Sequence, residues 1–211
     1  YRGCVSWSGS VFEYLMPEDR DAFSDFVRAL KAQLASEKLV LLLALPPKTC
    51  RGQTGLLCEA HDFRVLGRNA DLCVLKNASV ALGAPSALAD IGRMNEAVRY
   101  AVSEIPAKKL LCSLPAGGLQ WALPWHQGQR ARPLAGAQAA EQAVQVGAPV
   151  RYDDAAQAPH YNFWRGGTEQ EVWFEDARSY RAKCALAAEY RLGGVAVPEA
   201  AQWYSQLWGI L

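Results

Sequence analysis

The sequence predicts an α/β domain built around a parallel sheet. Strand-like and helix-like segments alternate along the 211 residues. The strand-like segments are uniformly apolar, as strands buried on both faces are. This alternation is typical of parallel sheets covered by helices. One stretch, 150–174, breaks the pattern and predicts a β-hairpin inserted into this architecture.

The first expected helix begins at Pro17-Glu18-Asp19, because proline suits a first helical turn and acidic side chains favour the positive helix end. Its apolar side chains recur at helical spacing and are expected to share one face: Phe23, Phe26, Val27, Leu30 and Leu34. An apolar strand over 39–45 follows and ends at Pro46-Pro47. A second strand of this kind is expected over 70–75.

The remaining elements follow from the same signals. A helix is expected over 94–105 and ends at Pro106, and a strand is expected over 110–114 and ends at Pro115 and Gly117-Gly118. An alanine-rich helix over 136–146 and a hairpin that pairs 161–164 with 171–174 around Arg165-Gly166-Gly167 come next. The last two elements are a helix capped by Asp176 that runs to about Tyr190 and a strand over 194–197.

The bulk properties exclude some classes of partner. The net charge is +1, which gives no electrostatic reason to expect nucleic acid or an anionic membrane. No apolar run approaches the roughly 20 residues needed to span a bilayer. The chain begins at Tyr1 and shows no signal peptide, so a fragment or a processed form is expected.

The six cysteines form no Cys-x-x-Cys pair and have no histidine at metal-ligand spacing. A zinc site is therefore not expected, and no metal or cofactor is predicted. Cys73 and Cys112 lie in apolar strands and are expected to be buried thiols. Cys50 and Cys58 lie in a loop and could form a disulfide in an oxidising environment, a question that the sequence leaves open.

Four segments carry a resemblance to a known family: Ala-Leu-Pro-Pro-Lys at 44–48, Arg-Tyr-Ala-Val-Ser-Glu-Ile-Pro at 99–106, Arg-Tyr-Asp-Asp-Ala-Ala-Gln-Ala-Pro at 151–159 and Glu-Val-Trp-Phe-Glu-Asp-Ala-Arg-Ser at 171–179. They resemble the bacterial branch of glycoside hydrolase family 18 associated with spore and cell-wall sugars. The resemblance implies a (β/α)8-barrel-derived domain over 1–211, with 122–175 as a small α+β insertion. It also implies a carbohydrate ligand, a polymer of N-acetylglucosamine such as chitin or peptidoglycan, and an extracytoplasmic, cell-wall or spore location.

The resemblance places barrel strands four to eight at Val11 to Tyr14, 39–45, 70–76, 109–114 and 194–197. The first three strands have no counterpart. Five strands would leave exposed parallel edges, because a barrel closes at a fixed strand number and tilt. We therefore expect a second chain, self-association, or a different path of the N-terminal residues.

Family 18 enzymes carry an acidic signature on the fourth strand. Its last glutamate protonates the leaving oxygen, and the aspartate two residues earlier orients the acetamido group that attacks the anomeric carbon, the substrate-assisted exception among glycosidases. Glu13 takes the place of the acid and is the catalytic candidate, with Tyr14 beside it as a substrate contact. Val11 stands where the family has the orienting aspartate.

The other strand ends also depart from the family. Lys76-Asn77-Ala78-Ser79 replaces Met-x-Tyr-Asp, Gly117-Gly118-Leu119-Gln120-Trp121 replaces Tyr-Gly-Tyr-Asp-Trp, and Pro198 replaces a tryptophan. The remaining substrate-binding candidates are Asn77, Gln120 and Trp121, the last as a stacking surface. Each lost group is worth about 10²–10³ in rate by analogy with other enzymes, so efficient hydrolysis is not expected.

Lys76 ends an apolar strand at a position expected to face the barrel interior. Desolvation there would lower its pKa and make it a candidate amine nucleophile. An ion pair with Glu13 or another acid, or a side chain that reaches solvent, is the alternative.

His61 matches a scaffold position and is expected to be structural, and His126 and His160 are expected in loops. The aromatic group Tyr161, Phe163, Trp164 and Trp173 is expected to form hairpin core rather than a ligand platform. Three functions stay open at this point. They are a degenerate or engineered family 18 hydrolase-like domain (a pseudoenzyme), a non-catalytic carbohydrate- or protein-binding module, and a redesigned pocket with Lys76 as a reactive amine.

Overall fold

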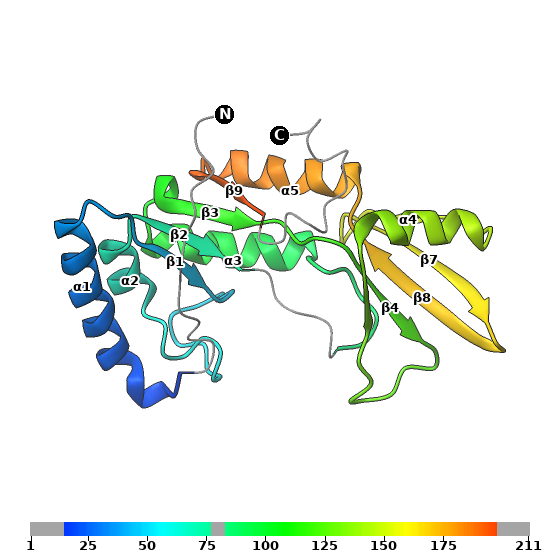
Figure 1. Cartoon of the computed structure of the whole chain (residues 1–211), viewed down its shortest axis with the longest axis horizontal. Helices are drawn as coiled ribbons and strands as arrows, with labels where there is room; N and C mark the ends of the chain where they lie inside the picture. Colours follow the sequence, from blue (N-terminus) through cyan, green and yellow to red (C-terminus); the bar gives the residue numbers. More distant parts are fainter. Residues whose placement is uncertain (1–14, 77–82, 198–211) are drawn as a thin grey trace.

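The computed structural model describes residues 15–76 and 83–197. Two sheets lie side by side (Figure 1). One is a four-stranded parallel sheet with the order β1-β2-β3-β9, and the other is a five-stranded sheet with the order β5-β4-β8-β7-β6. Within these ranges, no helix is long and apolar enough to cross a membrane.

The parallel sheet confirms the strands expected as barrel strands five to eight. They are β1 (Leu42–Leu45), β2 (Leu72–Leu75), β3 (Leu110–Ser113) and β9 (Gly194–Ala196), each parallel to its neighbour. The expected fourth strand at Val11 to Tyr14 lies outside the described residues. The described part of the barrel is therefore an open sheet with β1 at one edge and β9 at the other.

Four helical segments lie where the sequence predicts them, namely η1 (Pro17–Asp19) with α1 (Arg20–Ser36), α3 (Ile91–Glu104), α4 (Gly136–Gln145) and α5 (Ala177–Glu189). The sequence analysis did not predict α2 (Phe63–Asn69) or η2 (Ala107–Lys109). Helix α3 begins three residues earlier than expected, because Asp90 caps it by accepting the N–H of Arg93 at 2.9 Å. Asp176 caps α5 as predicted, accepting from the N–H groups of Arg178 and Ser179. Phe26 is an exception to the predicted helix face, since it is exposed.

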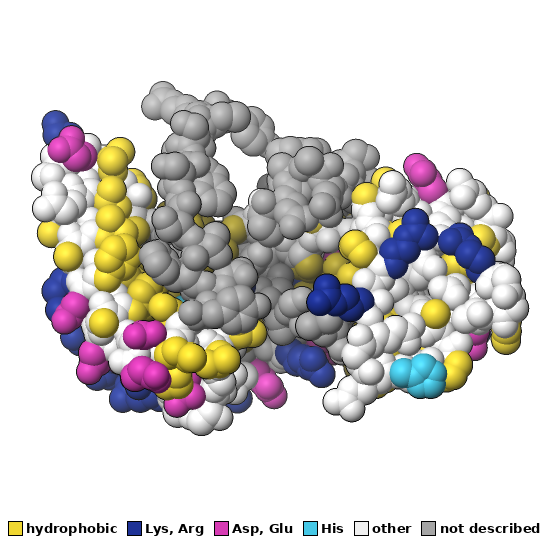
Figure 2. Space-filling view, turned by 60° about the horizontal axis from the view of Figure 1, so that its bottom comes forward, with side chains coloured by type: hydrophobic (Ala, Val, Ile, Leu, Met, Phe, Trp, Pro, Cys, Tyr) yellow, Lys and Arg dark blue, Asp and Glu magenta, His cyan; other side chains and the backbone are white. Residues whose placement is uncertain are grey.

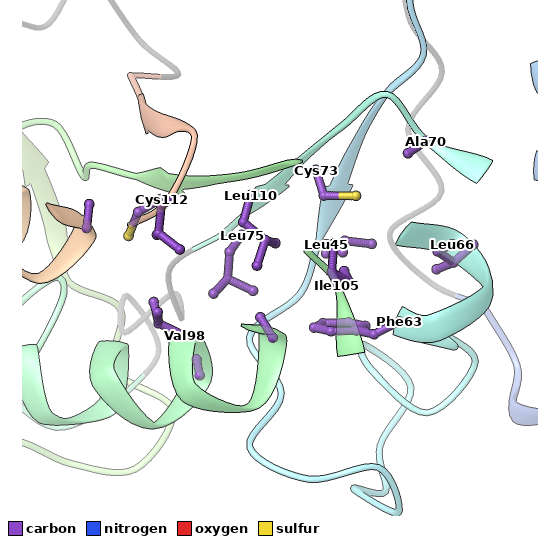
Figure 3. Packing of buried hydrophobic residues seen from close by; sticks show 14 of the residues in the cluster. Leu45, Phe63, Leu66, Ala70, Cys73, Leu75, Val98, Ile105, Leu110 and Cys112 are labelled. Carbon is purple, nitrogen blue, oxygen red and sulfur yellow. The ribbon is translucent and has the colours of Figure 1, made fainter. Parts of the chain in front are cut away.

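One face of the parallel sheet forms the main core with the helices (Figure 3). Leu45, Cys73, Leu75, Leu110 and Cys112 alternate onto this face and pack against side chains of the helices and their ends, namely Phe63, Leu66, Val98 and Ile105. The two cysteines are buried thiols, as expected, and desolvation raises the pKa of Cys73 to about 11 and that of Cys112 to about 12. Cys50 and Cys58 are free thiols in this structure.

The opposite face of the parallel sheet is apolar and incompletely covered. The register aligns Leu42 with Leu72 and Ala44 with Val74, so these side chains share one side of the sheet. Leu42 and Ala44 are exposed, whereas Leu72 and Val74 are partly exposed. This is the side that would face the interior of a closed barrel.

The second sheet consists of β4 (Gly118–Ala122), β5 (Arg132–Leu134), β6 (Arg151–Asp153), β7 (Ala158–Arg165) and β8 (Thr168–Phe174), all paired antiparallel. The predicted hairpin is confirmed as β7 and β8. Gly166 and Gly167 join them with φ values of 57° and 78°, a left-handed pair that glycine adopts without steric cost. The sheet begins at Gly118, before the expected boundary of the 122–175 insertion, and that boundary stays a prediction.

Helix α4 covers one face of the antiparallel sheet (Figure 1). Tyr161, Phe163, Val172 and Phe174 pack there with Ala139 of the helix. The hydroxyl of Tyr161 donates to the backbone oxygen of Ala139 at 2.8 Å, which satisfies its polar group inside the core.

Candidate functional site

In parallel α/β folds, ligands bind at the carboxyl ends of the strands. In this chain the first residues after β1, β2, β3 and β9 are Pro46, Lys76, Leu114 and Val197. Among the residues that the structure describes, no carboxylate directly follows a parallel strand. Glu13, Tyr14 and Asn77 lie outside the described residues, so their predicted roles remain predictions.

A small cavity lies at this edge of the sheet, between the ends of β1 and β2 and the first turns of α3. Its volume is about 40 Å³. Most of its lining is apolar, and its charged members are Lys76, Asp90 and Arg93. A volume of this size holds about one water molecule, whereas small-ligand sites span roughly 300–1,000 Å³. This cavity is therefore too small for a sugar ring.

Lys76 is exposed in the structure, which contradicts the expected burial of this side chain and agrees with the alternative of a side chain that reaches solvent. The physical reason is the uncovered side of the sheet: the described residues do not close a barrel around the end of β2. A role of Lys76 as a nucleophile stays a prediction without support from burial.

A different lysine is buried at the end of β1. Lys48 follows Pro46-Pro47 and is only 1% exposed. Its ammonium donates to the backbone oxygens of His61 at 3.1 Å and Arg51 at 3.4 Å, and desolvation lowers its pKa. These bonds fasten the loop that leads to α2 onto the carboxyl end of β1. The sequence analysis did not predict that Lys48 is buried. Its position directly after an apolar strand and two prolines is the sequence feature that could have indicated it.

His61 contacts this lysine through its backbone oxygen, which accepts the hydrogen bond from Nζ of Lys48. Its ring is buried and packs edge-on against Phe23, with 5.5 Å between centroids. Nδ1 of His61 has no hydrogen-bond partner among the described residues. Desolvation, with the charges of Lys48 and Lys76, lowers its pKa to about 4, so the ring is neutral at pH 7. This environment supports the structural role expected for His61.

The two binding candidates on β4 point to opposite faces of the antiparallel sheet. Gln120 lies on the α4 side, buried, and its Nε2 donates to Oε1 of Gln170 at 2.8 Å. Trp121 lies on the other side, is fully buried at 0% exposure, and donates its Nε1 hydrogen to the backbone oxygen of Gly83 at 3.0 Å. The prediction of Trp121 as an open stacking surface is wrong for this structure, because Ala87 and Ala158 belong to the cluster packed around it.

The hairpin aromatics divide into two groups. Tyr161, Phe163 and Trp173 are buried, as expected for hairpin core. Trp164 is 71% exposed, so its assignment to the core is wrong. Trp164 lies near the hairpin turn, and it is not part of the buried cluster around Trp121. His160 also differs from expectation, since it lies in β7 and not in a loop. Its ring stacks on that of Trp173, with 4.5 Å between the ring centroids.

The comparisons with known proteins are consistent across sequence and structure. The family model described as glycosyl hydrolases family 18 matches residues 5–202. The cortical fragment-lytic enzyme of Bacillus cereus is 36% identical over 204 residues, which cover 95% of this chain and 47% of that relative. The putative sporulation-specific glycosylase YdhD of Bacillus subtilis is 29% identical over 187 residues, which cover 87% of this chain and 44% of that relative.

Solved structures give the same fold. The spore cortex-lytic enzyme SleL of Bacillus cereus superposes with a TM-score of 0.90 at 36% identity, covering 94% of this chain and 47% of that one. A chitinase from Chromobacterium violaceum gives a TM-score of 0.87 at 26% identity, covering 94% and 62%. This chain therefore spans about half the length of the curated relatives that it matches. The four parallel strands are a segment of a (β/α) barrel, and the chain belongs to glycoside hydrolase family 18.

Proposed function

We propose that this chain binds N-acetylglucosamine-containing glycan, with bacterial peptidoglycan as the preferred polymer, and does not hydrolyse it efficiently on its own. One observation carries the proposal: among the described residues, Pro46, Lys76, Leu114 and Val197 directly follow the barrel strands, and none of them is a carboxylate, in a scaffold that superposes on family members. The relatives named for lytic action on spore cortex support peptidoglycan as the polymer.

The chemistry of the family requires more than a proton donor. The acetamido carbonyl of the substrate must be oriented for attack and its developing charge stabilised. The sequence resemblance aligns Val11 and Ala78 with the aspartate and the tyrosine that carry out those tasks in the family. At about 10²–10³ in rate for each lost group, Glu13 alone would retain only a small fraction of the activity.

We also propose that further (β/α) units from another polypeptide cover the apolar side of β1. Leu42 at the start of this edge strand is 45% exposed, and Leu39 and Val40, which precede the strand, are 55% and 67% exposed. Figure 2 shows a band of hydrophobic side chains on the half of the molecule that carries the parallel sheet. An exposed apolar edge of a parallel sheet favours association, because its backbone groups can pair with another strand and its side chains can be buried against it.

The function is tested by hydrolysis of a fluorogenic chitooligosaccharide, measured beside the variant Glu13→Gln. The proposal expects no turnover above background from either protein, together with retention of the chain on insoluble peptidoglycan. Turnover that disappears in Glu13→Gln would show that the acid works despite Val11 and Ala78. That result would replace the binding function with a hydrolytic one.

A further inference from the structure

The side chain of Trp164 is unusual for its place in the fold. It lies in the eight-residue strand β7 next to Phe163, which is buried against α4, yet 71% of its own surface is exposed. A large apolar ring left in water at a fixed position of a regular strand is an available contact surface. Nothing in the hairpin core requires an indole at this position, because the ring contributes little to packing.

Polar groups are fixed around this ring by the strand register. Glu169 of β8 lies directly opposite Trp164, and Glu171 lies opposite Asn162 on the same face. Nδ2 of Asn162 donates to Oε1 of Glu169 at 3.1 Å, and Nε1 of Trp173 donates to Oε1 of Glu171 at 2.7 Å. The two carboxylates are therefore positioned beside the indole before any ligand binds. Among the described residues, Oε2 of Glu169 and Oδ1 of Asn162 accept no hydrogen bond and so are available as acceptors.

We infer that Trp164, Asn162 and Glu169 form a glycan subsite on the hairpin, distinct from the carboxyl edge of the parallel sheet. The inference rests on the proposed function and adds a second contact for the same polymer. The indole would stack on the C–H face of a pyranose ring. Asn162 and Glu169 would hydrogen-bond the hydroxyl and acetamido groups at the rim of that ring.

The shape of this surface fits a polymer. Side chains on one face of a strand recur about every 6.6–6.8 Å, so the exposed side chains of Trp164 and Asn162 lie about 7 Å apart, and His160 beyond them is partly buried against Trp173. A stretch of this length accommodates about one sugar ring of a linear chain. A flat face of this kind needs no enclosed pocket, which agrees with the small size of the cavity at the strand ends.

Other occupants fit less well. A protein interface core is depleted in charge, whereas this ring lies on the same face as Asn162, Glu169 and Glu171. An anionic lipid surface would be repelled by the carboxylates of Glu169 and Glu171. A neutral polyhydroxylated ring satisfies both requirements, since it has an apolar face for the indole and donors for the carboxylates.

The experiment measures retention of the whole chain on insoluble peptidoglycan, chitin and cellulose by sedimentation. Trp164→Ala is expected to weaken retention on peptidoglycan or chitin about tenfold, the effect of a central aromatic contact. Trp164→Tyr should recover part of it, and Glu169→Gln should give an intermediate loss. Phe26→Ala is the matched control, because Phe26 is an exposed aromatic residue on α1 and should leave retention unchanged.

The outcomes separate the subsite from the proposed function. Loss on only one of the two acetamido polymers would still support the subsite and would identify the polymer. If the unsubstituted chain binds and Trp164→Ala binds equally well, the subsite is overturned and the function stands. If the unsubstituted chain binds neither peptidoglycan nor chitin, both are overturned. Equal retention on cellulose with the same loss in Trp164→Ala would overturn the assignment to acetamido sugars, and a change only in native mass would indicate a protein partner instead.

Discussion

Nζ of Lys183 lies 2.6 Å from Oε2 of Glu175, and neither side chain has any exposed surface. The pair joins α5 to the end of β8, where the backbone N–H of Glu175 donates to the oxygen of Gly117 at 3.1 Å. Desolvation raises the pKa of Glu175, and the ammonium of Lys183 opposes that shift. The ion pair therefore lies at the junction of the two sheets, where β3 leads into β4.

Removing one partner of this pair leaves an uncompensated buried charge. Lys183→Met is expected to lower the free energy of unfolding by about 3–5 kcal/mol. The double variant Glu175→Gln/Lys183→Met should recover part of that loss, because no charge is then left unpaired. Urea denaturation of the three proteins measures both effects. Equal stability of Lys183→Met and the unsubstituted chain would contradict the role assigned to the pair.

His61 predicts a pH dependence of stability. Its pKa is lowered to about 4 in the fold from an ordinary 6.5, so the unfolded chain binds a proton more readily. The stability that comes from the neutral ring is present above pH 6.5 and is lost as the pH falls toward 4. The slope should approach about 1.4 kcal/mol per pH unit within that range.

The substitution His61→Leu isolates this contribution. Carboxylates also titrate as the pH falls, so the useful quantity is the difference in unfolding free energy between the two proteins at each pH. That difference should change between pH 6.5 and 4 and stay constant above 6.5. A constant difference throughout would mean that the histidine titrates normally in the fold.

Gly67 of α2 lies against Ile105, and a Cβ atom placed there would come 2.5 Å from Cγ1 of that residue. Ile105 is buried and branched, so it cannot move aside cheaply. Gly67→Ala is therefore expected to lower stability by about 1–3 kcal/mol, although alanine favours the helix. Gly52→Ala is the control, because no atom lies within 4 Å of a Cβ there.

The clash predicts a coupling between the two positions. Ile105→Ala removes the crowding atoms, so Gly67→Ala should cost less in that background than in the unsubstituted chain. Thermal or urea unfolding of the four proteins in the cycle gives the coupling. Additive effects would rule out the contact as the cause.

The exposed edge at β1 predicts association. At micromolar concentration the chain should sediment as more than a monomer, or bind a complementing barrel fragment, because Val40 and Leu42 are 67% and 45% exposed. Val40→Lys should reduce this association by placing a charge on the edge. Val144→Lys on α4, where the side chain is 82% exposed, is the matched control. A compact monomer that ignores both substitutions would contradict the second-chain proposal.

The sequence predicts the architecture better than the surfaces. Strands β2 and β3 were predictable because buried parallel strands are uniformly apolar. The β7–β8 hairpin was predictable because Gly166-Gly167 favours a two-residue turn with positive φ values at both positions. Strand β4 was missed, since Gly117-Gly118 is also a strand-ending signal.

Burial of single side chains could not be predicted in the same way. Trp121 and Trp164 lie on the same face of one sheet, yet the first is sealed by the segment near Ala87 and the second extends beyond that cover. Lys76 was expected inside a barrel that the described residues leave open. In each case the exposure of the side chain depends on which distant segment packs over it. Strand periodicity and composition do not indicate which segment that is.

The central claim is binding without efficient hydrolysis, and one assay on purified peptidoglycan tests it most directly. The fraction of protein retained on the polymer and the reducing ends released into solution are measured in the same sample. The account predicts retention with no release of reducing ends above a protein-free control. Release of reducing ends that is abolished by Glu13→Gln would contradict it.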